Sequence, residues 1–430
     1  MAPQPPAAFS RLALCLWAAA SAAALPEPAV LVGDAAEYAV MFLSWTRHLS
    51  PGVQAADLDA YNHLIHARPV PGSVPVTPRH DPFLELPGVS PPVWDLRHFW
   101  FYSFLASPFL LLAQLVGLHP LASFALLHSA MGLCVVLLAR RWSGPAGALA
   151  AALTLAASPA LWYANKIHTE PLTICSVLAG FIGFAAARPA WGALLVSLGA
   201  AQNNLLAPLA AAMLATAWFS QPGQRPLTLR LGAACAALIG LAPAFYWSRH
   251  GFTNPISALG YVQPELLTSK RLLSIWIDLD RGLLLLWPLA LPCLAAALAR
   301  IAGRSILSNP ILLTATFYAA YAQAVMSMQG NWNSGASHLV QRYSVWFIPL
   351  AWFPLRWWLE SAWTAPAARR ATCLALLSLL AAWSAFQFRP SQPDTVVQFN
   401  ALSRWWYSNL PSLLDPEPEI FLERACQSEL

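Results

Sequence analysis

The sequence predicts an all-α polytopic membrane protein, and three observations support this fold class. Of its 430 residues, 58% are hydrophobic and only 10% are charged, whereas a soluble domain has about 25% charged residues. Apolar runs of bilayer-spanning length recur along the chain. Basic residues between these runs fall on one side of the predicted membrane. A soluble enzyme, a nucleic-acid-binding protein and a disordered chain are therefore disfavoured.

The first predicted span covers residues 12–32 and directly follows Arg11. The small residues 20–24 are also typical of a signal-peptide cleavage site. The length of the apolar run and the acidic segment after it favour an uncleaved span.

Ten further spans bring the prediction to about 11 transmembrane helices. We expect residues 1–388 to form one transmembrane domain and residues 389–430 a periplasmic tail. The polar segment 33–98, rich in Pro, Asp and His, is predicted to be a large first periplasmic loop, which surface helices extend to residue 120. The ten spans are 121–139, 146–164, 171–187, 190–203, 204–219, 231–247, 283–299, 311–327, 345–363 and 372–388.

The aromatic segment 99–117 decides the topology, because it is long enough either to cross the membrane or to lie on its surface. If it lies on the surface, the basic residues between spans all share one side, which the positive-inside rule makes cytoplasmic. We therefore predict a surface helix here, and a bacterial inner-membrane protein whose large loop faces the periplasm. The basic residues are Arg11, Arg140, Arg141, Arg188, Arg225, Arg230, Arg300, Arg304, Arg369 and Arg370.

Acidic residues are rare in this chain, and two of them directly follow the first span. Asp34 and Glu37 are three positions apart, which places them on one face if the segment is helical. Such a pair can act as a general base or bind a metal or sugar hydroxyls. The alternative is a pair of interfacial charges that end a helix.

A second acidic pair, Asp57 and Asp59, forms an Asp-Leu-Asp sequence in the same loop. In a strand or loop both carboxylates could hold a divalent cation, although this pattern is common by chance. Asp34, Glu37 and Asp59 are the candidate metal ligands, and the sequence leaves metal dependence open.

Under the predicted topology, further polar clusters all lie on the outward side. This coincidence indicates one outward-facing active cavity. They comprise His98; Lys166, His168 and Glu170; Gln202, Asn203 and Asn204; Asp278, Asp280 and Arg281; and the polar segment 330–338 followed by Arg342.

Five segments in order resemble motifs of the bacterial integral-membrane glycosyltransferases of the C superfamily, relatives of protein O-mannosyltransferases and lipid A aminoarabinose transferases. The second acid of the family's Gly-Asp-Glu motif is Ala35 here, with an acid displaced to Glu37, so we assign the family's acidic role to Asp34. The segments are GDAAEY at 33–38, ADLDAYN at 56–62, Ser158 to Pro171, Asp278 to Pro288 and Trp332 to Pro349.

The resemblance implies transfer of a monosaccharide from a polyprenyl-phosphate donor to a lipid, glycan or protein on the periplasmic face. In that reaction a carboxylate deprotonates the acceptor hydroxyl, while cations stabilise the departing phosphate. Asp34 and Glu37 are the expected catalytic residues. The expected substrate- and phosphate-binding residues are Asp57, Asp59, His98, Lys166, His168, Glu170, Arg281 and Arg342.

Two other classes are compatible with a polytopic chain that has no nucleotide-binding motif. A transporter or flippase for lipids or glycans predicts inverted repeats, which the sequence does not show. A channel or assembly subunit would not need acids gathered on one face. The sugar, the acceptor, the stereochemistry and the oligomeric state are not determined by the sequence, and membrane lipids are the other expected partners.

Overall fold

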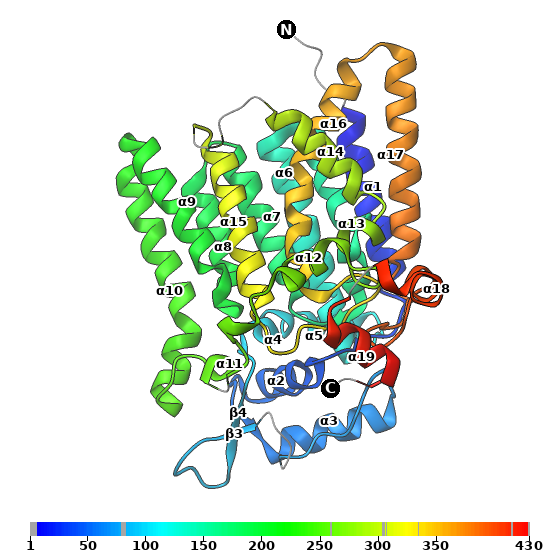
Figure 1. Cartoon of the computed structure of the whole chain (residues 1–430). Coiled ribbons are helices and arrows are strands. Elements are labelled where there is room, and N and C mark those ends of the chain that lie inside the picture. The colour runs from blue at the N-terminus through cyan, green and yellow to red at the C-terminus, as the bar shows by residue number, and fades with distance from the viewer. Residues whose placement is uncertain are drawn as a thin grey trace.

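The computed structural model describes residues 7–78, 83–258, 260–302, 306, 308–333, 335–413 and 416–428. Most of them form helices that run side by side as a bundle (Figure 1). A layer containing α2 (Ala35–His48) and α3 (Ala55–Ala67) covers one end of the bundle. The start of α1 (Ala7–Ala24) and the connection between α16 (Trp352–Thr364) and α17 (Ala367–Gln387) lie at the opposite end. Arg304 of the predicted basic side lies outside the described residues.

Four of the described helical segments are long and apolar enough to cross a membrane. The shortest has 18 residues and is about 27 Å long at 1.5 Å per residue. These segments support the predicted membrane protein. They are α1; Pro120–Ala156, comprising η1 (Pro120–Ala122) and α6 (Ser123–Ala156); Pro222–His250, comprising η4 (Pro222–Gln224) and α10 (Arg225–His250); and α17.

The predicted bundle of about 11 spans is not confirmed, because the other predicted spans form shorter or less apolar helices. The predicted span 283–299 is broken, since Pro288 lacks an N–H group and disfavours a helical conformation of the residue before it. The predicted span 345–363 begins as the 3-10 helix η6 (Arg342–Ala351). The shorter or less apolar helices are α7 (Glu170–Ala185), α8 (Pro189–Gln202), α9 (Ala207–Ser220), α13 (Leu283–Leu286), α14 (Ala290–Ile301) and α15 (Pro310–Ser327).

Helix α6 is bent where the sequence predicted the connection between two spans. Gly144 has φ 72° and ψ −170°, a conformation that glycine adopts readily. A Cβ atom placed on Gly147 would lie 3.6 Å from the carbonyl oxygen of Ala139, so the chain turns back here. The second arm ends at Ala156, before the predicted 164, and the 3-10 helix η2 (Pro159–Asn165) follows it.

The segment 99–117 forms two short helices, α4 (Phe101–Ala106) and α5 (Phe109–Leu115). They have 6 and 7 residues, whereas a membrane-spanning helix needs about 20. This geometry agrees with the prediction that the segment does not cross.

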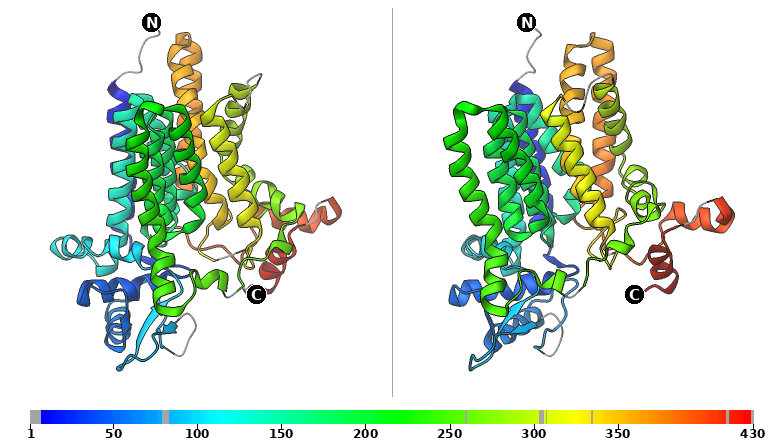
Figure 2. Two further views of the ribbon diagram at one scale, coloured as in Figure 1. Left: turned by 90° about the vertical axis from the view of Figure 1, so that its left-hand side faces the viewer. Right: turned by 60° about the vertical axis from the view of Figure 1, so that its left-hand side comes forward.

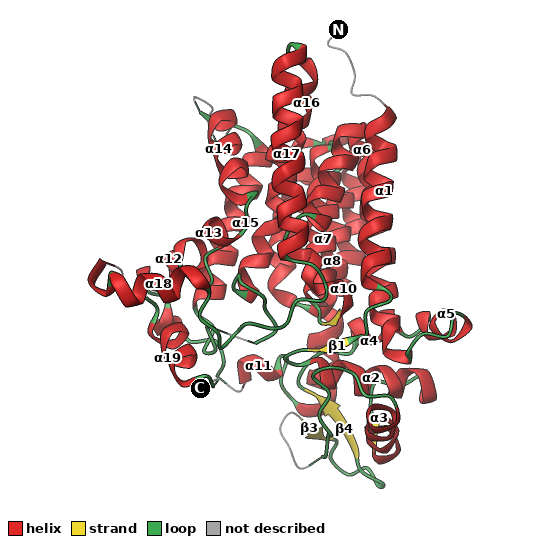
Figure 3. Cartoon of the chain, turned by 90° about the vertical axis from the view of Figure 1, so that its right-hand side faces the viewer, coloured by secondary structure: helices red, strands yellow, loops and turns green. Residues whose placement is uncertain are grey.

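Short strands connect the covering layer to the bundle (Figure 3). Strand β1 (Val30–Leu31) pairs in parallel with β5 (Lys166–Ile167), so that Leu31 lies opposite Ile167. The chain segments that follow these two strands therefore leave the pairing side by side. A second sheet joins β2 (Val53–Gln54) and β3 (Phe83–Glu85) to the central β4 (Val93–Leu96).

The C-terminal segment packs beside the covered end of the bundle, and α18 projects from it (Figure 2). Its residues 390–395 bind the bundle through hydrogen bonds. The Trp162 indole donates to the Gln392 carbonyl, and the Thr395 N–H donates to the Ser337 carbonyl. The remaining helices are η3 (Asn204–Leu206), α11 (Pro255–Ala258), η5 (Pro264–Leu266), α12 (Ser269–Ile277), α18 (Ala401–Asn409), η7 (Pro411–Leu413) and α19 (Pro418–Cys426).

Candidate functional site

The pairing of β1 with β5 brings the first acidic motif next to the His168 segment. Asp34 lies three residues after β1, at the start of α2, and His168 directly follows β5. Gly33 has φ +51°, and a Cβ atom there would lie 3.3 Å from the Ala336 Cβ and 3.9 Å from the His168 Nε2. Glycine is therefore suited to this close approach.

Asp34 and Glu37 contact the same histidine, as expected for positions on one face of a helix. The His98 Nε2 lies 3.5 Å from the Asp34 Oδ2, and its Nδ1 lies 3.1 Å from the Glu37 Oε1. The backbone N–H of His98 also donates to the Glu37 Oε2 at 3.2 Å. The loop before α4 is thus fixed on the N-terminal turn of α2.

Arg342 joins Asp34 to a third acid, Glu170. Its Nη1 lies 3.6 Å from the Asp34 Oδ2, and its Nε donates to the Glu170 Oε1 at 3.1 Å. The Trp346 indole donates to the other Glu170 oxygen at 2.9 Å. Glu170 is the first residue of α7, where the helix dipole favours a negative charge. We call Asp34, Glu37, His98, Glu170 and Arg342 the cavity cluster.

The opposite charges in this cluster keep Asp34 and His98 in their ionised forms. Burial raises the pKa of Asp34, but the charges of His98 and Arg342 outweigh burial and lower this pKa to about 2. Burial lowers the pKa of His98, but Asp34 and Glu37 raise it to about 9. At neutral pH the site therefore contains a carboxylate beside an imidazolium and a guanidinium.

His168 lies behind this cluster and is fully buried. Its Nδ1 is 3.9 Å from the Glu170 Oε1, and neither ring nitrogen has a hydrogen-bond partner within the described residues. Burial lowers its pKa well below the usual value, so the ring is neutral. Its backbone N–H donates to the Tyr102 hydroxyl, which also lies 2.7 Å from the Nε2 of His128.

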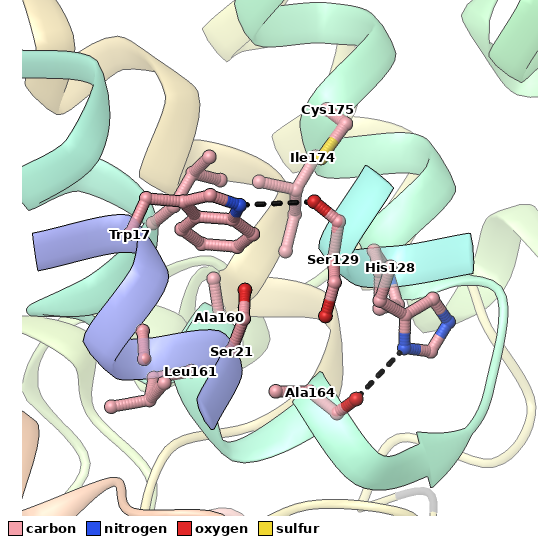
Figure 4. A pocket seen from close by; sticks show the side chains of 12 residues that line it. Trp17, Ser21, His128, Ser129, Ala160, Leu161, Ala164, Ile174 and Cys175 are labelled. Atoms are coloured by element: carbon pink, nitrogen blue, oxygen red, sulfur yellow. Dashed lines mark hydrogen bonds between the residues drawn. The ribbon is translucent and has the colours of Figure 1, made fainter. Parts of the chain in front are cut away.

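Two cavities lie near these residues, and only one has room for a substrate. The larger has a volume of about 420 Å³, and Asp34, His98, Glu170 and Arg342 line it. The smaller, near His128 and Trp17, has a volume of about 30 Å³ and a mostly apolar lining (Figure 4). That volume corresponds to about one water molecule. The larger cavity is therefore the candidate active site.

Asp34, Glu37 and His98 could also hold a divalent metal. One ligand atom from each lies within 4.8 Å of the others, and carboxylate with imidazole is a donor set typical of zinc and related ions. Asp59, the third candidate metal ligand from the sequence, is exposed on α3 and is not in this group.

The structure does not bring the carboxylates of Asp57 and Asp59 together. The segment is helical, so residues two positions apart point in different directions. Asp57 is buried, accepts from the Gln54 N–H at 2.9 Å as part of the cap of α3, and contacts His48 at 2.8 Å. Asp59 faces solvent. Neither residue lines the larger cavity.

Lys166 and Arg281 are buried away from the lining of this cavity. The Lys166 ammonium donates to the Asn165 side chain at 2.8 Å and to the Pro390 carbonyl, and it lies 4.9 Å from the centre of the Trp162 ring. The Arg281 Nε donates to the Asn333 Oδ1 at 3.2 Å. Both cations therefore contribute to the packing of the C-terminal segment, and neither lines this cavity.

Three aromatic and basic residues of the site were missed from the sequence. The ring centre of Tyr38 lies 5.5 Å from that of His98, Trp346 binds Glu170, and Arg97 donates to the Tyr261 hydroxyl. Tyr38 is part of the Gly33–Tyr38 motif, so the motif could have identified it as a site residue. For Trp346 the only signal was that a buried acid needs a donor.

Comparison of the chain with protein-family models, with curated proteins and with solved structures found no match in any of the three.

Proposed function

We propose that this chain is an integral-membrane glycosyltransferase of the C superfamily. It transfers a monosaccharide from a polyprenyl-phosphate donor to a lipid, glycan or protein acceptor at the larger cavity. One observation carries the proposal: Asp34, close behind the first membrane helix, faces the same cavity as Arg342. A base for the acceptor and a cation for the donor phosphate are thereby brought together.

In this mechanism Asp34 accepts the proton of the acceptor hydroxyl while the oxygen attacks the anomeric carbon of the sugar. The bond between that carbon and the phosphate oxygen breaks, and the lipid phosphate leaves with the electron pair. Arg342 can bind two phosphate oxygens at once through its planar guanidinium. Glu170 holds the Nε of Arg342, and the Nη1 lies 3.6 Å from the Asp34 Oδ2, so the guanidinium lies between the two acids at the lining of the cavity.

Phosphate binding also strengthens the base. In the free protein, Arg342 is, after His98, one of the neighbouring basic residues that lower the pKa of Asp34. A donor phosphate that takes up the positive charge of Arg342 weakens its effect on Asp34, so this pKa rises toward a value useful for proton transfer. If Asp34, Glu37 and His98 hold a divalent metal, it supplies further positive charge to the departing phosphate.

The cavity has apolar walls that suit a lipid-linked donor. Leu205, Ala242, Ile256, Val262 and Met326 line its side between the ends of α10 and α15. An isoprenoid chain can leave the cavity there toward the bilayer, while its phosphate remains at the cavity cluster.

The proposed location is the bacterial inner membrane, with the cavity facing the periplasm. The α16–α17 connection, next to Arg369 and Arg370, lies at the bundle end away from α2 and α3, as the positive-inside rule requires. In a cysteine-free background, Val74→Cys and Ser220→Cys should be labelled from opposite sides of the membrane. Labelling of both from outside would contradict this orientation.

The transfer itself is tested with purified protein in nanodiscs, a polyprenyl-phosphate-linked hexose and a membrane-lipid acceptor fraction. Asp34→Asn should lower kcat by about 10²–10⁴-fold, the usual contribution of a general base, without loss of expression. Glu37→Gln should have a smaller effect, and losses of equal size in both variants would favour a shared metal. Asp59→Asn, an exposed acid-to-amide change, is the control.

Normal turnover by Asp34→Asn would remove its assignment as the base. The same assay separates the alternative of a polytopic lipid or glycan transporter or flippase, because a transporter moves the donor across the bilayer without breaking its glycosyl bond.

A further inference from the structure

The end of the bundle away from α2 and α3 carries a strong positive charge, and we call it the basic end. It contains the bend of α6, the α7–α8, α9–α10 and α16–α17 connections, the start of α1 and the end of α14 (Figure 1). Among the acids that the structure describes, only Glu360 lies near this end, and its Oε1 already accepts from the Arg356 Nε at 2.8 Å. The other arginines of the basic end therefore lack a free carboxylate of the described chain.

Three exposed arginines of the basic end lie over tryptophan rings, and we call Arg188, Arg225 and Arg300 the stacked arginines. Contacts within about 6 Å of the ring centre are cation–π interactions. Because the ring covers one face of the planar guanidinium, the N–H groups in its plane stay available to other acceptors. The distances from the guanidinium carbon to the ring centre are 5.2 Å for Arg188 and Trp142, 5.1 Å for Arg225 and Trp218, and 5.8 Å for Arg300 and Trp357.

The same stacking occurs near the covered end of the bundle, but there carboxylates of the chain complete it. Arg249, 5.0 Å from a phenylalanine ring, donates to Asp95 at 2.6 Å. Arg271, 5.4 Å from a tryptophan ring, donates to Glu419 at 2.9 Å. None of the stacked arginines pairs with an acid that the structure describes, and Arg225 donates only a long hydrogen bond of 3.4 Å to a backbone carbonyl. Their counter-ion must come from outside the described chain.

The three tryptophans under the stacked arginines add further donors. The indole N–H groups of Trp142, Trp218 and Trp357 donate to no described residue, and none of them is fully buried. By contrast, the Trp352 indole inside the bundle donates to the Gly147 carbonyl at 3.0 Å. Tryptophans at the ends of membrane helices lie at the level of the lipid headgroups. Each stacked pair therefore presents guanidinium and indole N–H groups at the depth of the lipid phosphates.

We infer that the stacked arginines bind the phosphates of phosphatidylglycerol in the leaflet at the basic end. A guanidinium can donate two parallel hydrogen bonds to two phosphate oxygens. This lipid is favoured over a zwitterionic one because no ammonium competes for its phosphate, and because basic residues are attracted to an anionic membrane surface. The inference adds a lipid partner on a surface remote from the larger cavity, and it does not depend on the proposed transfer reaction.

The test counts phospholipids bound to the full-length protein by native mass spectrometry, in detergent with equal amounts of phosphatidylglycerol and phosphatidylcholine. Wild type should retain mainly phosphatidylglycerol. The triple variant Arg188→Gln, Arg225→Gln and Arg300→Gln should bind it about tenfold more weakly, the lower value for loss of a charged hydrogen bond. The matched control is Arg11→Gln, Arg140→Gln and Arg230→Gln, which removes the same charge from exposed arginines of the basic end. It should retain the lipid.

A second triple variant replaces the stacked arginines by lysine, which keeps the charge but has no planar fork. It should also bind phosphatidylglycerol more weakly than wild type. Equal retention of the two lipids by wild type would overturn the inference, and equal losses in the stacked and control glutamine variants would show diffuse attraction instead of these sites. A rise in Tm with inorganic phosphate as large as with phosphatidylglycerol would exclude a lipid site. None of these measurements requires turnover, so they are separate from the test of glycosyl transfer.

Discussion

The cavity cluster and a second group of buried charges at the C-terminal segment are built alike but have different access to solvent. In the second group, which we call the tail cluster (Asp280, Arg281, Asn333, Glu423 and Arg424), every residue is at most 3% exposed. In the cavity cluster the side chain of Asp34 is 33% exposed and that of Arg342 is 15% exposed. Both clusters join segments more than a hundred residues apart.

The tail cluster is closed to solvent, and its residues contact one another. Asn333 accepts from Arg281 and from Arg424 at 3.2 Å each, and its amide donates to Glu423. The Arg424 Nε lies 3.8 Å from the Asp280 Oδ2. Charged residues of this apolar chain therefore occur in two settings. Those of the cavity cluster are open to a cavity, whereas those of the tail cluster are buried and hold the C-terminal segment in place.

The largest effect on stability is expected from breaking the tail cluster. Asp280→Ala removes the ion-pair partner of the buried Arg424 and the acceptor of the Asn400 N–H and the Ser403 hydroxyl. Removing one partner of a buried ion pair costs about 3–5 kcal/mol. Unfolding in detergent should show this loss, with near-normal turnover per folded molecule. Stability equal to that of Asp59→Ala would refute the closed-cluster interpretation.

An Arg342→Lys exchange should affect activity more than stability. Lysine keeps the charge but cannot hold Glu170 and two phosphate oxygens through one planar group. We expect a loss of about 1–3 kcal/mol in transition-state stabilisation, the size of a charged hydrogen bond. Initial rates at varied donor concentration provide the measurement. Unchanged kcat and KM in both Arg342→Lys and Arg342→Ala would exclude the phosphate role.

Asp394 should order the loop that precedes Arg342. Its Oδ2 accepts from the N–H groups of Ala336 at 2.9 Å and Ser337 at 3.3 Å, and Ala336 has φ 63°. Because Ala336 abuts Gly33, loss of these bonds loosens the loop before Arg342. In Asp394→Ala, amide hydrogen exchange across 331–341 should accelerate about tenfold, corresponding to about 1.4 kcal/mol. Exchange as slow as in the exposed-acid control Glu85→Gln would contradict this role.

The smallest expected effect is a pH dependence in the loop beside the tail cluster. Burial raises the pKa of Asp278 from 3.8 to about 6. The folded state therefore holds this proton more tightly than the unfolded state, so stability decreases as pH rises from about 4 to 6 and is level above that. Asp278→Asn keeps the Oδ1 that accepts from the N–H groups of Asp280 and Arg281.

This variant should lack that decrease and should raise Tm at pH 7 by at most a few degrees. Thermal unfolding between pH 4 and 7 measures it, with Asp59→Asn as the exposed-acid control. A decrease as steep as in wild type would show that another group is responsible.

Local patterns predicted local features well. Apolar runs located the long helices α1, α10 and α17, and the break of segment 99–117 agrees with its predicted place outside the membrane. The pattern failed where proline or glycine interrupts an apolar run, as at Pro288 and Gly144. Hydropathy measures the preference of a segment for the bilayer, but it does not report whether the segment forms one continuous helix.

For the site, the sequence indicated which kinds of residue to consider better than it indicated which of them lie together. Asp34, Glu37, His98, Glu170 and Arg342 were all selected from the sequence, and the structure brings them together. Asp57, Asp59, Lys166 and Arg281 were selected on the same grounds, and the structure separates them from the cavity. Helix periodicity alone could have separated Asp57 from Asp59, had the segment been interpreted as a helix.

The sequence by itself determined that this chain is a membrane-type helical protein with its scarce acids in the segments between apolar runs, because composition and hydropathy act within each segment. Only the tertiary structure decided which charges share a cavity. The contact of Arg342 with Asp34 and Glu170 depends on how η6, α2 and α7 pack, and the pairing of β1 with β5 sets the position of His168. Such contacts between distant segments arise from the packing of whole elements, which no local pattern encodes.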